Sequence, residues 1–177
     1  MKRTTWLAAT ILVSATLLTG AAKAQDIKGR NFVNAGIGIG TFGFSGTGGL
    51  PITASIEHGF SDKISAGLYL GMISRNYLDD VKFRYFVAGV RGSYHFNELL
   101  NVENKKLDVY GGAALYYRNA KVKYTGTGNH PDYKVSDGTV GLGIFAASRY
   151  FFTDSFGAYA ELGYGISPLQ LGATFTF

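Results

Sequence analysis

The sequence predicts an all-β fold, an eight-stranded antiparallel up-and-down transmembrane β-barrel. Three observations support this fold class. Apolar residues recur at every second position over most of the chain, and no segment longer than two turns keeps a helical period. Glycine, with 25 of 177 residues, and aromatic residues, at 15%, are both abundant. A pattern typical of an export signal precedes the alternating region.

The composition excludes several classes of function. With 46% hydrophobic and 16% charged residues, the chain is expected to fold rather than to remain disordered. It has no cysteine, which excludes a disulfide scaffold, a thiolate zinc site and a cysteine nucleophile. No metal-ligand spacing and no clustered basic face of the kind that binds nucleic acid is found. We therefore expect no cofactor, no metal and no nucleic-acid partner.

Residues 1–24 are predicted to be a cleaved signal peptide. A basic start, a short apolar segment and a small-x-small sequence, AKA, precede Gln25, which is the order of a secretory signal. The alternative is a membrane-anchoring helix, but the apolar segment is shorter than the ~20 residues that span a bilayer. The barrel domain is thus predicted to be 25–177. Its net charge is +2, because three of the 17 basic residues and none of the 12 acidic residues lie in 1–24.

Eight segments of the remaining chain have the alternation of strands. Each is long enough to cross a membrane at a tilt, which takes about 9–11 residues. In order, they are 31–40, 50–60, 64–74, 82–96, 107–118, 140–152, 156–166 and 169–177. The three prolines, Pro51, Pro131 and Pro168, lie at a strand start or in loops, as expected for a residue that cannot donate to a strand ladder.

The predicted connections alternate between short and long. On one side, 61–63 and 153–155 are predicted to be tight turns, and the link 97–106 is longer but still polar. Between these lie 41–49, 75–81 and 119–138, of which the last is the longest. Short turns on one side and longer loops on the other are typical of transmembrane barrels, although the short connection at Ser167-Pro168 departs from the pattern. An even number of strands places both termini on one side, which we predict to be periplasmic.

The two faces of the strands differ in chemistry. One face carries Leu, Ile, Val, Ala and Phe, and the other carries many glycines and most of the charges. A membrane barrel turns its apolar face to lipid and its polar face to the lumen, whereas a soluble barrel does the reverse. We favour the membrane arrangement, because strand length and the export signal agree with it. The charged residues predicted to form a lumen polar network are Glu57, Arg91, Asp108, Arg149 and Glu161.

Aromatic residues are predicted to gather at the short-turn ends of the strands, as in the interfacial girdle of a membrane barrel. The last strand, LQLGATFTF, ends with Phe175 and Phe177 on its apolar face. With the signal peptide and eight alternating strands, this chain resembles the small outer-membrane β-barrels of the OmpA transmembrane-domain, OmpX and opacity type. The resemblance implies a monomer in the outer membrane, and it implies that Phe175 and Phe177 belong to a signal read by the outer-membrane assembly machinery.

The function is predicted to be structural or surface-interacting. An eight-stranded barrel is just wide enough for its own side chains to fill, so we expect a polar lumen whose charges are paired. The long loop could contact outer-membrane lipid and the phosphates of lipopolysaccharide. Its residues singled out for this contact are Lys121, Lys123, Tyr124, His130 and Lys134.

Three alternatives remain open: a narrow channel for small solutes, a lipid A-modifying enzyme and a soluble periplasmic ligand-binding barrel. His95 with Ser93 and Glu98 superficially offers an enzymatic set. The three histidines of the predicted domain lie on different elements, however, and His58 and His95 are near short turns, far from the outer leaflet. We therefore expect no enzyme activity, and we expect these histidines to be solvated or interfacial.

Overall fold

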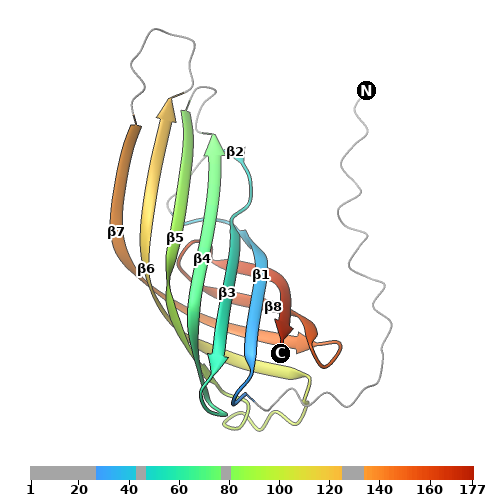
Figure 1. Ribbon diagram of the computed structural model, residues 1–177. Helices are drawn as coiled ribbons and strands as arrows, with labels where there is room; N and C mark the ends of the chain where they lie inside the picture. The colour runs from blue at the N-terminus through green and yellow to red at the C-terminus, as the bar shows by residue number, and fades with distance from the viewer. Residues whose placement is uncertain (1–26, 43–46, 77–80, 125–133) are drawn as a thin grey trace, which may run out of the picture.

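The computed structural model describes residues 27–42, 47–76, 81–124 and 134–177 (Figure 1). They form a closed antiparallel up-and-down barrel of eight strands, which confirms the predicted fold class. No helix in these ranges has the length and hydrophobicity required to cross a membrane. The predicted signal peptide, 1–24, lies outside the described residues.

The barrel closes by pairing its first and last strands. Its strands are β1 (Asn31–Ile39), β3 (Ile52–Gly59), β4 (Ile64–Asn76), β5 (Val81–His95), β6 (Leu107–Tyr124), β7 (Lys134–Phe151), β8 (Phe156–Tyr164) and β9 (Leu169–Thr176). Consecutive strands pair, and β9 pairs with β1 with Ala173 opposite Ala35. The two-residue β2 (Thr47–Gly48) pairs only with the end of β4. Closure removes the open sheet edges that lipid cannot hydrogen-bond.

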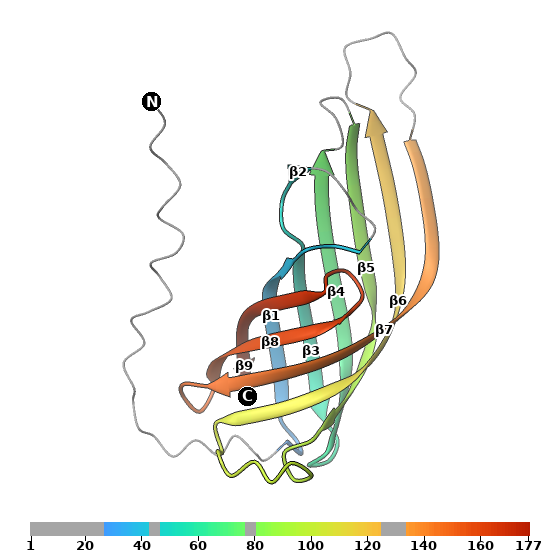
Figure 2. The same ribbon diagram turned by 180° about the vertical axis from the view of Figure 1, so that it is seen from behind.

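The wall of the barrel is higher on one side than on the other. Strands β6 and β7 have 18 residues each, whereas β1, β3, β8 and β9 have eight or nine. Strands β4 to β7 therefore rise beyond the rest, as Figures 1 and 2 show. We call the end that they reach the upper end, and the end with the short turns the lower end.

The predicted loop 119–138 is wrong in extent. Strands β6 and β7 continue their ladder from Leu107 opposite Tyr150 up to Lys123 opposite Lys134, so only 125–133 separates them. The residue pairs that extend the ladder beyond the predicted strands are mostly polar and lie above the apolar part of the outer face. A ladder of backbone hydrogen bonds does not require apolar alternation, so the period of two could not reveal this extension.

The outer face of the barrel is apolar and exposed. Leu142, Ile144 and Leu162 have 70%, 67% and 61% of their surface exposed, and Ile56, Leu68 and Val90 are exposed on neighbouring strands. Aromatic side chains surround the lower end of this face. The exposed ones are Phe60, Tyr94, Tyr150, Phe152, Phe156, Phe175 and Phe177. Alternation along each strand sends these residues outward and their sequence neighbours inward.

The interior has three layers along the barrel axis. A lower apolar cluster consists of Ile27, Phe32 and Phe151. The charged residues lie above it. An upper apolar cluster consists of Tyr69, Ile73, Tyr85, Val87, Tyr116 and Ile166. Aliphatic residues inside the upper barrel were not predicted.

Ile166 corrects one prediction in particular. Alternation assigns it to the outer face of the strand 156–166, but it is 1% exposed and packs in the upper apolar cluster. Strand β8 ends at Tyr164, so the turn that follows, rather than the strand period, directs the Ile166 side chain inward. The inward side chains of Val87 and Ile166 also come close to Gly71, where an added Cβ would approach them to 2.8 and 3.0 Å.

Candidate functional site

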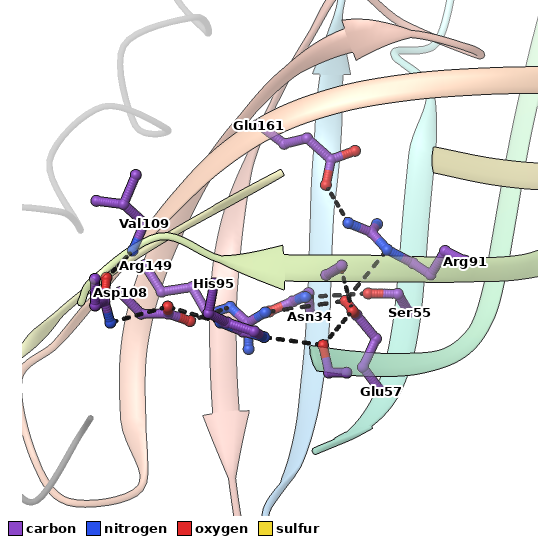
Figure 3. Close-up of polar contacts among 12 residues, drawn as sticks. Asn34, Ser55, Glu57, Arg91, His95, Asp108, Val109, Arg149 and Glu161 are labelled. Carbon is purple, nitrogen blue, oxygen red and sulfur yellow. Dashed lines mark hydrogen bonds and ion pairs between the residues drawn. The ribbon is translucent and has the colours of Figure 1, made fainter. Parts of the chain in front are cut away.

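The five residues predicted to line the lumen come together in its lower half. Each is supplied by a different strand, from β3 (Glu57), β5 (Arg91), β6 (Asp108), β7 (Arg149) and β8 (Glu161). All five are at most 4% exposed. Figure 3 shows the polar contacts that join them. We call them, with the polar residues that contact them, the charged layer.

Arg91 joins two carboxylates. Its Nη2 lies 2.8 Å from Oε2 of Glu161, and its Nε lies 3.2 Å from Oε1 of Glu57. Gln170 donates a hydrogen bond of 3.1 Å to the other oxygen of Glu161. The guanidinium also stacks on the ring of Phe145, with 3.9 Å between the guanidinium carbon and the ring centroid. Arg91 therefore holds β3 and β8 against β5 across the lumen.

Arg149 is held differently, mainly by aromatic faces. Its guanidinium carbon lies 4.3 Å from the ring centroid of Phe32 and 4.0 Å from that of Tyr110. Its nitrogens are 3.5 Å from Asp108 and 3.9 Å from Glu57, which are ion-pair distances rather than good hydrogen bonds. A buried guanidinium between two rings is stabilised by cation–π attraction in addition to the neighbouring carboxylates.

Hydroxyl and imidazole groups link the two arginine centres. Ser65 donates a hydrogen bond of 3.0 Å to Oε2 of Glu57, and Ser93 donates to the same oxygen. The hydroxyl of Ser65 lies 3.0 Å from Nε2 of His95, and Nδ1 of His95 lies 2.8 Å from Oδ1 of Asp108. A continuous polar chain therefore runs from Glu161 through Arg91 and Glu57 to Asp108.

His95 corrects a second prediction. It is not solvated or interfacial but 2% exposed, stacked beside Tyr110 in the charged layer. The signal was present in the sequence, because His95 is four residues after Arg91 in one strand and alternation places both on the same face. His58, by contrast, is exposed and contacts Asn31 at 2.9 Å.

The order Ser65–His95–Asp108 has the connectivity of a hydrolytic triad. A nucleophile requires access for its substrate and donors for the oxyanion. Ser65 is 0% exposed, and its hydroxyl donates to Glu57. The geometry thus gives these residues a buried hydrogen-bonding role. The predicted set does not come together, because Ser93 bonds to Glu57 and Glu98 pairs with Lys63 at the lower surface.

The other predicted site residues lie at the two ends of the barrel. Lys121 is exposed on β6, directly opposite the exposed Arg84 of β5, which was not predicted. Lys123 and Tyr124 end β6 and Lys134 begins β7, whereas His130 lies outside the described residues. At the lower end, Phe175 and Phe177 are exposed on the outer face, with ring centroids 6.1 Å apart.

A cavity of about 20 Å³ lies above the Arg91–Glu161 pair, lined also by Tyr69, Tyr116 and Gln170. This volume holds about one water molecule. Among the described residues, no three His, Asp or Glu side chains are grouped as metal ligands.

Comparison with known proteins relates the chain to others by fold alone. No protein-family model matches the sequence, and no curated protein matches it. Solved structures are similar. The N-terminal β-barrel domain of Pseudomonas aeruginosa OprF is 19% identical, with a TM-score of 0.58, and the match covers 85% of this chain and 98% of that one.

Two further structures give the same picture. Ail, the attachment invasion locus protein of Yersinia pestis, is 15% identical over 85% of this chain and 99% of that one, with a TM-score of 0.54. Neisserial surface protein A is 15% identical over 83% and 92%, with a TM-score of 0.55. The chain therefore has the fold of the small eight-stranded barrels, in agreement with the resemblance in its sequence.

Proposed function

We propose that this chain is an outer-membrane β-barrel protein with a closed lumen and a structural or surface-interaction role. The proposal rests on the distribution of side chains, which is apolar on the outside and charged on the inside, the reverse of a soluble protein. Residues such as Leu142 and Leu162 are exposed around the outside, whereas Glu57, Arg91 and Arg149 are buried inside. Soluble proteins rarely expose an apolar surface of this extent, and lipid would cover it.

Packing within the lumen supports a closed barrel. The charged layer lies between the lower and the upper apolar clusters, so that water and ions would have to pass two apolar constrictions and one layer of paired charges. The cavity of about 20 Å³ does not amount to a path. An eight-stranded barrel has an interior of the size that side chains fill.

The orientation follows from the charges above the apolar face. Arg84 and Lys121 are exposed and directly opposite one another, two pairs above Phe86 on β5. Like charges directly opposite in a sheet repel, and a phosphate between them would relieve the repulsion. We infer that lipopolysaccharide phosphates occupy this level of the outer leaflet. The lower end, where the described residues begin at Ile27 and end at Phe177, then faces the periplasm.

The last strand supports recognition by the outer-membrane assembly machinery. Phe177 exchanges backbone hydrogen bonds with Asn31, 2.8 and 3.1 Å long, where the barrel closes. Its ring is 62% exposed. We infer that the assembly machinery contacts this aromatic ring before the barrel closes, and that pairing of the last strand with β1 then completes the barrel. We propose that the closed barrel is a monomer.

Membrane fractionation with heat-modifiable gel mobility tests the proposed location. We expect the protein in the outer-membrane fraction, with a faster-migrating unheated form because the barrel stays folded in detergent. Deletion of Phe177 should reduce the folded form in a pulse-chase experiment. Recovery of the wild-type protein in the soluble periplasmic fraction would contradict the proposal and favour the soluble ligand-binding alternative.

The lipopolysaccharide contact has a separate test. We expect lipopolysaccharide in the bilayer to raise the unfolding midpoint of the wild-type protein, since a ligand that binds only the folded state stabilises it. The Arg84→Gln, Lys121→Gln double variant should lose most of this increase. Lys105→Gln, Lys106→Gln, in the connection between β5 and β6 at the lower end, is the control with the same change of charge. Equal stabilisation of both variants would refute the contact.

A further inference from the structure

The connection between β5 and β6 carries two exposed leucines. Leu99 and Leu100 have 69% and 57% of their surface exposed, which is close to the exposure of an outward-facing strand residue such as Leu68. Figures 1 and 2 show this connection, in yellow-green, at the lower end of the barrel. A single exposed leucine needs no explanation, but a continuous apolar patch marks a contact surface. The question is therefore what lies beside the two leucines.

One turn of helical hydrogen bonding fixes the start of the connection. The N–H of Leu100 donates to the C=O of Phe96 at 2.8 Å, and the N–H of Asn101 donates to the C=O of Glu98 at 3.2 Å. Asn101 ends the turn with a φ of 49°, a left-handed conformation that asparagine tolerates better than most residues. Side chains three and four residues apart share a face of such a turn. Phe96, Leu99 and Leu100 therefore form its apolar face.

The position of Phe96 shows that this face points outward. Phe96 follows the outward-facing Tyr94 by two residues, and their ring centroids are 5.0 Å apart. Gly111 of β6 faces outward beside the inward-facing Tyr110. A Cβ added to Gly111 would meet the Phe96 ring at 3.3 Å. The apolar face of the turn is thus continuous with the aromatic side chains that surround the lower end of the outer face.

The opposite face of the turn is polar and tied to the barrel. Nδ2 of Asn97 donates to Oδ1 of Asp108 at 3.3 Å, and Oδ1 of Asn97 accepts a hydrogen bond of 2.8 Å from the N–H of Val109. Glu98 pairs with Lys63 of the neighbouring turn at 2.9 Å. These contacts fix the orientation of the turn, so that the two leucines are held on its outer side.

The charges around the turn cancel. The connections 61–63 and 97–106 together contain three acidic and three basic residues, which are Asp62, Glu98, Glu103, Lys63, Lys105 and Lys106. Attraction to a charged surface is therefore weak, and the exposed apolar area is the main driving force for a contact. Amphipathic segments of this kind lie at a membrane surface with their apolar face in the acyl boundary.

We propose that Phe96, Leu99 and Leu100 form an interfacial anchor, in which the two leucines insert among the acyl chains of the periplasmic leaflet. The placement of the lower end at that leaflet rests on the proposed function. Lipid is favoured over a periplasmic protein as the occupant, because the apolar face of the turn continues the outer face that lipid would cover. The anchor would fix the depth of the barrel in the bilayer on the side of β5 and β6.

Spin labels measure the depth of the turn in the bilayer. The chain has no cysteine, so Leu99→Cys and Leu100→Cys each carry a single label on the full chain in phospholipid discs. Oxygen concentrates among the acyl chains and a nickel chelate in water, so the ratio of their relaxation effects gives the depth. We expect both labels about 5–10 Å inside the headgroup boundary. Leu68→Cys is the lipid reference, and Glu103→Cys, exposed in the same connection, is the water reference.

A serine variant tests whether insertion stabilises the barrel. The Leu99→Ser, Leu100→Ser double variant should lower the urea unfolding midpoint in bilayers, because two side chains lose their contact with lipid. Exposed side chains in water tolerate such changes with little effect on stability. Glu103→Ser, Lys105→Ser, at exposed positions of the same connection, is the control that should keep the wild-type midpoint. Leu99→Ile, Leu100→Ile should also keep it, because the apolar surface remains.

Three results would overturn the proposal. The first is a nickel effect at the two leucine positions as strong as that on Glu103→Cys, which would leave the leucines in water for a periplasmic partner. The second is coupling between labels on separate copies that grows with the protein-to-lipid ratio, which would favour a second copy. The third is insertion that requires anionic lipid. A Leu68→Cys label in water would instead contradict the membrane barrel itself, so the two proposals can fail separately.

Discussion

The charged layer and the upper apolar cluster lie in the same lumen but are held together by different physical means. In the charged layer, Arg91 and Arg149 are fixed by the direction and distance of their contacts with Glu57, Asp108 and Glu161. In the upper cluster, residues such as Ile73 and Val87 are fixed by shape alone. Removing one partner of an ion pair should therefore destabilise the barrel strongly, because the other charge stays buried without compensation. Truncating a packed apolar side chain should instead lower stability in proportion to the volume lost.

Arg91→Ala should have the largest effect on stability. It leaves the Glu57 and Glu161 carboxylates buried without their shared cation, and breaking a buried pair in this way costs about 3–5 kcal/mol. The Arg91→Ala, Glu161→Ala double variant should lose less than the sum of the two single variants, because it removes one of the uncompensated charges. Urea unfolding in lipid measures all three. Additive single effects would mean that the layer is hydrated rather than sealed between the apolar clusters.

Ile73→Ala should have the next largest effect. The side chain is 1% exposed within the upper apolar cluster, and Ile-to-Ala changes at such sites cost about 2–5 kcal/mol. Met72→Ala is the matched control, because Met72 is the preceding residue and is 50% exposed on the outer face. The same urea titration compares them. An equal loss in both variants would show that the upper lumen is not packed around Ile73.

Gly71→Ala should cost less, about 1–3 kcal/mol, as overpacking typically does. The new Cβ would approach the side chains of Val87 and Ile166 within 3.0 Å, and both can shift slightly. Gly92→Ala is the control, because a Cβ on this exposed glycine meets nothing within 4 Å. If Gly71→Ala is as well tolerated as Gly92→Ala in urea unfolding, the upper cluster has room that the structure does not indicate.

The two layers differ in how far the sequence could predict them. Charged residues are rare in the strands, so alternation alone picks out Glu57, Arg91 and Arg149 as inward-facing, and the structure places them in the lumen. Their partners were missed, because which serine or histidine meets which carboxylate depends on register between strands. His95 was misjudged by its nearness to a turn, although its position in β5 has the same parity as Arg91.

The upper cluster could not be predicted by the same means. In the sequence, the inward-facing Ile73 and Val87 cannot be distinguished from apolar strand residues that face outward. Ile166 points into the lumen because the strand ends at Tyr164 and a turn follows. The height of β6 and β7 was missed for a related reason. Their upper pairs are held by backbone hydrogen bonds between polar residues, which leave no hydrophobic pattern in the sequence.

The smallest expected effect is on conductance, and it decides whether the layers close the lumen independently. Arg91→Ala removes the cation at the centre of the charged layer but leaves the upper and lower apolar clusters intact. We expect planar-bilayer recordings of the variant to match the wild type, with no stable channel, because apolar constrictions exclude ions by excluding water. The positive control is the triple variant Arg91→Ala, Ile73→Ala, Phe151→Ala, which shortens a side chain in each of the three layers. Heat-modifiable mobility shows whether this variant folds, and the folded variant should conduct. A channel in Arg91→Ala alone would make the charged layer the only barrier, and stable wild-type conductance would replace the closed barrel with the narrow channel alternative.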